Sequence, residues 1–353
     1  MPMVMYAKEL DTQQVDCFRK WCSEARHIVL LSHMGADGDA CGSLLGLAHQ
    51  LDRAAPAATV TPILPNGCPS AFRWLPGSSR ILSGDTERQR CEQCIARADL
   101  IVCLDINSPS RTDFLRQPLS DAAAHKVLID HHHGPDVEAF DIVFSDPDIS
   151  STCEYLLWIS LALWGKCHLS TDAARCLYAG LRTDTGGFAY SCSQPSCFHA
   201  AATLTAFDID PAGIHNSIAN SFSLNRMMLF GFAISQRLWV YPEKHTAIFA
   251  ISLDDQRRLG VGPEDFEGLV NYTLMMADIS IGACIREEAH RTKVSFRSKG
   301  ADVNHLARQL GGGGHTAAAA AATAMPFLDT LRQVRRLLGV DGLQPANSTP
   351  LIP

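Results

Sequence analysis

The chain has 353 residues, of which 46% are hydrophobic and 19% are charged, so it is long enough for two domains that each bury a core. No apolar run approaches the length needed to cross a bilayer, and residues 1–10 lack the basic start and apolar core of a secretion signal. The formal net charge of −7 argues against a long basic surface for duplex DNA or extended RNA. We therefore expect a cytoplasmic, globular protein that binds neither membranes nor duplex DNA.

The first part of the chain alternates helical patterns with short apolar runs that are typical of buried strands. The patterns predict helices at 12–24, 40–51 and 87–97, and strands at 28–31, 59–64, 100–105 and 126–130. Further helices are predicted from about residue 152 and over 172–181. Strands that alternate with helices predict an α/β fold with a parallel sheet.

The pattern changes after Trp239, where strands are predicted at 247–252, 279–286 and 293–297 and helices at 303–310 and 327–338. We therefore expect a smaller α/β domain with a mixed sheet, separated from the first by a helical connector and a cleft. The predicted boundaries are 1–195 for the catalytic domain, 196–236 for the connector and 237–340 for the second domain. Residues 341–353 are rich in proline and small polar residues and are predicted to be disordered.

Thirteen cysteines without an export signal indicate a reducing compartment. Only Cys91 and Cys94 have C-x-x-C spacing. A zinc or redox site would need a second pair or a thioredoxin-like context, so we interpret this pair as structural.

Three predicted strands end in acidic or histidine side chains. Because ligand groups in parallel sheets gather beyond the carboxyl ends of the strands, these side chains should face one crevice. A fourth segment adds an aspartate at the end of a predicted helix. The candidate set is His33, Asp37, Asp39, Asp105, His131 and Asp184.

Four carboxylates in this set balance the charge of two divalent cations, and two imidazoles complete the shells. Oxygen and nitrogen donors without thiolate argue against a structural zinc site, and the histidines favour manganese over magnesium. Taken singly, each acid is equally explained as a helix cap or a salt-bridge partner. Four separate segments that meet in one crevice favour a metal site.

At this point the chain resembles the DHH phosphoesterases, and in particular the branch of oligoribonucleases and phosphoadenosine phosphatases that carry a DHH-associated C-terminal domain. The resemblance covers about residues 10–340. It is carried by the triplet Asp130-His131-His132, by the spacing His33-x-x-x-Asp37-x-Asp39, and by two further segments. These are Arg182-Thr-Asp184-Thr-Gly and the pair Arg297-Ser298 followed by glycines 311–314 and His315.

The resemblance implies that two Mn(II) ions are bound, with Mg, Co or Fe as possible substitutes. His33 and Asp37 would ligate one ion, Asp39, His131 and Asp184 would ligate the other, and Asp105 would bridge them. A hydroxide shared by the two ions would attack the phosphorus. His132 would contact the phosphoryl group or protonate the leaving group, and Asp130 would orient a neighbouring histidine.

The resemblance also implies substrate contacts in the second domain. The contacts expected on this basis are Arg297, Ser298, Gly311, Gly312, Gly313, Gly314 and His315, with Arg286 as a weaker candidate. A glycine-rich backbone can approach a phosphate closely, and the planar fork of an arginine binds two of its oxygens.

The leading hypothesis is a manganese-dependent phosphodiesterase that releases mononucleotides from very short 5′-phosphorylated RNA, such as pApA or pGpG, and that also dephosphorylates pAp. A cyclic dinucleotide phosphodiesterase, a manganese pyrophosphatase or exopolyphosphatase, and a non-catalytic nucleotide sensor are the alternatives. The glycine-rich loop counts against the pyrophosphatase, and the complete ligand set counts against the sensor. Relatives are often dimers, so a homodimer is a further expectation.

Overall fold

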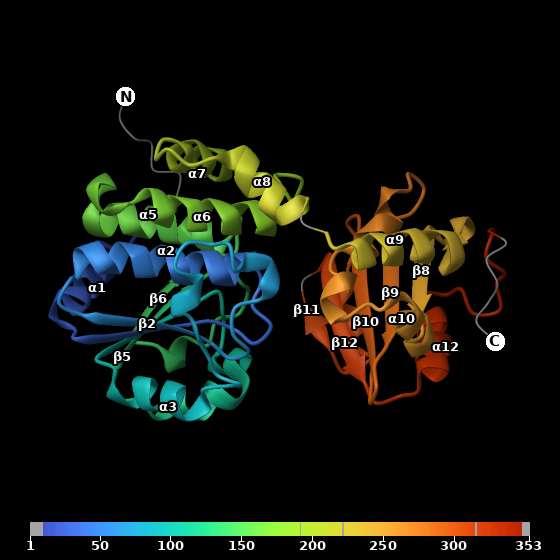
Figure 1. The fold of residues 1–353 in the computed structure, drawn as a ribbon, viewed down its shortest axis with the longest axis horizontal. Helices are drawn as coiled ribbons and strands as arrows, with labels where there is room; N and C mark the ends of the chain where they lie inside the picture. Colours follow the sequence, from blue (N-terminus) through green and yellow to red (C-terminus); the bar gives the residue numbers. More distant parts are fainter. Residues whose placement is uncertain (1–9, 191, 221, 315, 348–353) are drawn as a thin grey trace. The chain divides into compact units, whose positions relative to one another are not determined.

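The computed structural model describes residues 10–190, 192–220, 222–314 and 316–347, and it divides the chain into two units between residues 221 and 222 (Figure 1). Within these ranges, every helix is too short or too polar to span a bilayer. The helices that were predicted to form a separate connector are divided between the two units. The last of them, which precedes the second sheet, belongs to the second unit. Each unit has its own sheet and its own buried cores.

The first unit contains a six-stranded sheet in the order β3-β2-β1-β4-β5-β6, in which every pair of neighbours is parallel. This confirms the parallel sheet predicted from the alternation of strands and helices. The short strands β3 and β6 were not predicted. The strands are β1 (His27–Leu31), β2 (Thr59–Leu64), β3 (Leu82–Ser83), β4 (Leu100–Leu104), β5 (His125–Asp130) and β6 (Ile142–Ser145).

Helices cover both faces of this sheet, which explains why its central strands are continuous apolar runs. Along β1, Ile28 and Leu30 belong to one core, whereas Val29 and Leu31 belong to another on the opposite face. Figure 1 shows α2, α5 and α6 on one side and α3 on the other. The helices are α1 (Thr12–Glu24), α2 (Gly38–Ala54), α3 (Arg88–Arg97), α4 (Arg116–Asp121), α5 (Thr152–Trp164), α6 (Thr171–Asp184), α7 (Pro195–Thr205) and α8 (Pro211–Ala219).

The second unit contains a mixed sheet in the order β11-β12-β10-β9-β8-β7, in which β8 and β9 run parallel and the other neighbours run antiparallel. Its strands are β7 (Leu238–Tyr241), β8 (Thr246–Ile251), β9 (Ile281–Glu287), β10 (Thr292–Ser298), β11 (Gly313–Gly314) and β12 (Ala318–Thr323). Its helices are α9 (Leu224–Gln236), α10 (Leu253–Leu259), α11 (Asn304–Arg308) and α12 (Phe327–Leu337).

The alanine tract forms β12, where the sequence predicted no strand. Alanine has little preference for strands, so the pairing with β10 on one side and with β11 on the other accounts for its conformation. Two residues in the tail segment that was predicted to be disordered also contact the sheet. The Ala346 N–H donates to the carbonyl of Val240 at 2.8 Å, and the Asn347 side chain accepts from the Val240 N–H at 3.0 Å. Residues 348–353 lie outside the described residues.

Candidate metal centre

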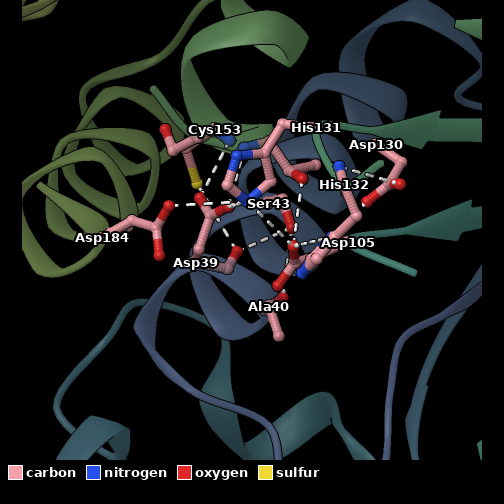
Figure 2. Close-up of polar contacts among 12 residues, drawn as sticks. Asp39, Ala40, Ser43, Asp105, Asp130, His131, His132, Cys153 and Asp184 are labelled. Atoms are coloured by element: carbon pink, nitrogen blue, oxygen red, sulfur yellow. Dashed lines mark hydrogen bonds and ion pairs between the residues drawn. The ribbon is translucent and has the colours of Figure 1, made fainter. Parts of the chain in front are cut away.

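Acidic and histidine side chains from four segments gather beyond the carboxyl ends of β1, β4 and β5 (Figure 2). In each of three groups, the potential ligand atoms all lie within 4.8 Å of one another. Asp105 belongs to two of these groups, a position suited to a bridging carboxylate. The groups are His33, Asp37 and Asp105; Asp39, His131 and Asp184; and Asp105, His131 and His132.

The connection from β1 to α2 places two aspartates differently. Asp37 caps α2, because its Oδ1 accepts the N–H groups of Asp39 at 3.0 Å and Ala40 at 3.1 Å. The capping role that the sequence left open is thus filled, while the second oxygen of Asp37 stays available as a ligand. Asp39 is buried in the first turn of α2.

The carboxylate of Asp39 is held by the start of a second helix. It accepts the N–H of Thr152 at 2.6 Å and that of Cys153 at 2.9 Å, both in the first turn of α5. These groups have no partner within the helix, and the positive end of the helix dipole favours an anion there. The start of α5 therefore fixes Asp39 while leaving lone pairs on both oxygens.

Asp105 follows β4 with a positive φ of 59°, a left-handed conformation that turns its side chain into the site. Its Oδ2 lies 3.3 Å from His33 Nε2, and its Oδ1 accepts the Thr152 hydroxyl at 3.2 Å. Burial alone would raise the pKa of Asp105. The close approach of His33 and the charges of the neighbouring histidines outweigh that effect and lower the pKa.

The ring of His33 has the orientation of a metal ligand. Its Nδ1 lies 3.1 Å from the backbone carbonyl of Met34, which fixes the ring and points Nε2 at Asp105. Among the described residues, this buried Nε2 has no hydrogen-bond partner with acceptable geometry. A buried nitrogen without a partner is unfavourable in a closed protein interior, and it fits a bound cation.

The pKa shifts of the acidic and histidine side chains also favour a bound cation. Burial, with the charge of Asp105, raises the pKa of Asp39 to about 7, and burial also raises that of Asp184 well above its usual range. Burial would lower the pKa of His131, but the surrounding carboxylates, Asp184 foremost, raise it to about 9. The carboxylates are thus crowded enough to hold protons, and divalent cations can replace those protons.

Close packing of α2 against α6 brings Asp184 to the same place as Asp39. A Cβ on Gly38 would lie 2.3 Å from Thr183 Oγ1, and one on Gly42 would lie 2.6 Å from the carbonyl of Cys176. A Cβ on Gly46, one turn further along α2, would likewise meet the side chain of Leu177. The absence of side chains along this stripe lets the two helices approach closely, so the sequence pattern sets the ligand spacing.

The two histidines of the triplet Asp130-His131-His132 have different neighbours. His131 Nε2 lies 3.4 Å from Asp184 and 3.7 Å from Asp105, within the cluster. His132 is held by Asp130, whose Oδ1 lies 2.7 Å from the ring Nδ1 and whose Oδ2 accepts the His132 N–H at 3.1 Å (Figure 2). Asp130 therefore holds the ring of His132 in one orientation.

One charged group in this region was missed by the sequence interpretation. Arg111 follows β4, and its Nη1 lies 3.0 Å from His132 Nε2. The only signal in the sequence was its position six residues after Asp105 on the same connection.

The candidates in the second unit fall into two groups. Arg286 and Arg297 line one pocket, together with Lys293 and Ser295 of β10, on the face of the sheet opposite α12. The buried guanidinium of Arg286 is already engaged, because it donates to the carbonyl of Pro263 at 2.9 Å and pairs with Glu288. The hydroxyl of Ser298 donates to a carbonyl of its own turn, that of Ala301.

The glycine-rich loop is partly explained by packing. A Cβ on Gly312 would lie 2.1 Å from the carbonyl of Ala320, and one on Gly314 would lie 2.6 Å from that of Ala318. These two glycines therefore allow the loop to approach β12, whatever else they do. Nothing around Gly311 or Gly313 demands a glycine for space, although Gly311 has a left-handed φ of 81°. His315 lies outside the described residues.

Comparisons with known proteins are consistent with this geometry. The model of the DHH family N-terminal domain matches residues 27–181, and that of the DHHA1 domain matches residues 247–336. The chain is 30% identical over 298 residues to the bifunctional oligoribonuclease and PAP phosphatase NrnA of Bacillus subtilis, covering 83% of this chain and 88% of that protein. NrnA of Thermus thermophilus is 26% identical, with 83% of each chain covered.

Solved structures of other proteins have folds similar to that of this chain. An exopolyphosphatase-related protein from Bacteroides fragilis superposes with a TM-score of 0.90 at 32% identity, covering 94% of this chain and 97% of that one. RecJ of Thermus thermophilus in complex with Mn²⁺ has a TM-score of 0.56 at 14% identity, covering 98% of this chain and 58% of that one. The RecJ likeness shows a shared fold.

Proposed function

The chain belongs to the DHH family, with a DHHA1 domain in its second unit, and on that premise we propose that it is a metal-dependent phosphodiesterase that cleaves very short 5′-phosphorylated RNA to mononucleotides. The observation that carries the proposal is the gathering of His33, Asp105 and their neighbours into three adjoining groups of potential ligands, two of which contain Asp105. The relatives named as oligoribonucleases match along most of this chain, through both units.

The site would hold two divalent cations, which we propose to be Mn²⁺ because the donors are carboxylates and imidazoles without thiolate. His33 and Asp37 would bind one, Asp39, His131 and Asp184 the other, and Asp105 both. Cations bound there supply a water of lowered pKa and neutralise charge on the phosphoryl oxygens.

His132 is proposed to handle the proton of the leaving group. Its Nδ1 proton is held by Asp130, so Nε2 is the atom that can carry a proton to the departing oxygen. The two hydrogen bonds of Asp130 to His132 keep the ring from turning away.

The second unit is proposed to bind the remainder of the substrate through Arg297, aided by Ser298, the glycines at 311–314, His315 and, more weakly, Arg286. Arg297 and Lys293, together with Arg286, are the cations that line the pocket beside β10, which suits an anionic ligand. The engagement of Arg286 by Glu288 supports its weaker rank.

A panel of substrates tests this proposal. The protein is incubated with Mn²⁺ and, separately, with pApA, pGpG, pAp, a cyclic dinucleotide and pyrophosphate, and products are followed by chromatography. We expect mononucleotides from the linear dinucleotides. Turnover of pyrophosphate alone would contradict the proposal, and no turnover of any compound would favour a nucleotide sensor.

Dephosphorylation of pAp is the second candidate activity. The relatives that match along most of the chain are named as bifunctional, with a PAP phosphatase activity beside the oligoribonuclease. Release of inorganic phosphate from pAp by the same preparation, abolished by the same metal-ligand substitutions, is the expected result.

A further inference from the structure

Arg111 lies on a connection that is tied to the rest of the metal centre. The segment Pro109–Leu115 follows β4, and the carbonyl of Arg111 accepts the N–H of Met34 at 2.9 Å, next to His33. Earlier in the same connection, the side chain of Asn107 donates to the carbonyl of His133 at 2.9 Å. The backbone that carries Arg111 is therefore fixed to the loops after β1 and β5, which hold candidate ligands.

The guanidinium of Arg111 reaches the inner side of the site. Its Nη1 lies 3.0 Å from Nε2 and 3.3 Å from Nδ1 of His132, so the guanidinium lies against the ring. Because Asp130 holds the proton of Nδ1, Nε2 is the ring nitrogen that can accept from Arg111. The positive charge of Arg111 also acts on His33, where it opposes the rise in pKa caused by Asp105.

This cation has no anionic partner among the described residues, although acidic groups lie nearby. Some other arginines of the chain are paired with carboxylates, such as Arg80 with Asp52 at 2.6 Å and Arg237 with Asp255 at 2.9 Å. Arg111 is only partly exposed, so solvent does not fully screen its charge. An arginine held at a site without a carboxylate partner is available to an anion that comes from outside.

The charge balance of the site indicates which anion fits. With two divalent cations, as in the proposed function on which this step rests, the four ligand carboxylates are neutralised. Arg111 adds a positive charge beside them, and a phosphodiester carries a single negative charge. We infer that Arg111 binds the nonbridging oxygens of the scissile phosphate and is a catalytic residue of this chain.

The geometry adds a reason why this residue is an arginine. The guanidinium is planar and can place two N–H groups on two oxygens of one phosphate, which a lysine cannot do. On binding phosphate, Arg111 leaves the lone pair of His132 Nε2 free to take up a proton. The residue thus acts where negative charge grows during the reaction.

The test uses Arg111→Gln and Arg111→Lys, with Arg116→Gln as the matched control. Arg116 is exposed and lies on the same connection, and no contact of its side chain with the site is seen. Three quantities are measured for each protein: Mn²⁺ affinity without substrate, affinity in Mn²⁺ for a pApA analogue whose bridging oxygen is a methylene group, and kcat/KM for pApA. Circular dichroism checks the fold.

For Arg111→Gln we expect unchanged Mn²⁺ affinity, analogue affinity weaker by about 10- to 100-fold, and kcat/KM lower by about 10²- to 10³-fold. Arg111→Lys should fall between this variant and the unmodified chain, because it keeps the charge and loses the fork. Arg116→Gln should match the unmodified chain in all three measurements.

Two results would overturn the inference: unchanged analogue affinity in Arg111→Gln, or a change in Mn²⁺ affinity as large as the change for the analogue. The second result would mean that Arg111 acts on the metal site and not on phosphate. An unmodified chain that neither binds the analogue nor cleaves pApA would instead overturn the proposed function, and the inference with it. The two failures are therefore distinguishable.

Discussion

The metal centre of the first unit and the pocket beside β10 in the second unit are built in different ways. At the metal centre, charged side chains from four segments point at one another, and Asp37 and Asp39 are held by backbone N–H groups at the starts of two helices. Beside β10, the candidate surface combines a few cations with small residues, and two loop glycines serve the approach of the backbone to β12. The charged side chains therefore fix which chemistry the metal centre can perform. In the second region, the small residues mainly fix the shape of the surface.

This difference predicts that substitutions in the two regions will have different kinetic effects. The metal centre should control the chemical step and metal loading, and the pocket should control substrate affinity. Four changes test that separation, beginning with the one of largest expected effect.

Replacing Asp105 by asparagine would test the comparison most severely. Asparagine has nearly the same shape and tolerates the left-handed φ of this position, so the fold should survive. The variant loses the charge of a carboxylate that belongs to two of the three groups of potential ligands, and turnover of pApA should fall on the order of 10³-fold. Steady-state kinetics with Mn²⁺ measure this. Asp121→Asn, an exposed aspartate at the end of α4, is the control, and substantial activity in Asp105→Asn would exclude a bridging role.

Replacing Arg297 by glutamine tests the other side of the comparison. The loss of a charged hydrogen-bond donor to an anion should raise KM for pApA by about 30- to 100-fold while Mn²⁺ affinity stays the same. Arg332→Gln, on the exposed side of α12, serves as the control. If Mn²⁺ affinity fell while KM stayed constant, the assignment of substrate contacts to this unit would be wrong.

Replacing Gly42 by alanine asks whether helix packing, and not only ligand chemistry, sets the metal centre. The new Cβ would meet the carbonyl of Cys176, so α2 and α6 must separate. We expect a loss of about 1–3 kcal/mol in the free energy of unfolding, with weaker Mn²⁺ binding as Asp39 and Asp184 move apart. Denaturant unfolding and metal titration measure both effects.

Gly231→Ala is the matched control for this substitution. Gly231 lies inside α9, and a Cβ there would meet no atom within 4 Å. Since glycine inside a helix is less favourable than alanine, Gly231→Ala should stabilise the protein by about 0.5–1 kcal/mol. A loss of stability in both variants would mean that the glycine stripe of α2 has no special role.

The pH dependence of stability gives the smallest expected effect. In the metal-free protein, the pKa of Asp39 is about 7 instead of 3.8, so the folded chain binds a proton that the unfolded chain lacks between these values, and stability falls as pH rises. The pKa of His131, raised to about 9, contributes stability below its ordinary value of 6.5 that is lost as pH rises through 9. Both shifts act in the same direction.

We therefore expect the Tm of the metal-free protein to fall by about 2–4 °C between pH 5.5 and pH 8.5. Because Mn²⁺ replaces these protons, the stabilisation by Mn²⁺ should grow over the same range. Thermal unfolding with EDTA or with Mn²⁺, at constant ionic strength, measures both trends. A metal-free Tm that rises with pH would show that the carboxylates of the centre are not crowded.

The strand-end ligands could be predicted because two independent patterns coincide: apolar runs that mark buried strands, and charged residues directly after them. The parallel order of the strands then brings the ends together. No such coincidence exists for β12, because six residues of mostly alanine favour a helix, and only the pairing with β10 and β11 makes them a strand. Arg111 was missed for a related reason, since its role depends on where a loop folds back and not on any periodicity.

The contact between Asp39 and the start of α5 has a practical consequence. The N–H groups of Thr152 and Cys153 belong to an apolar helix of the hydrophobic core, yet each is separated from the ligand cluster by a single carboxylate. Their proton resonances will shift when the charge on Asp39 is neutralised by a cation. The chemical shifts of these two backbone amides should therefore report ion binding. NMR can follow them without substrate or turnover.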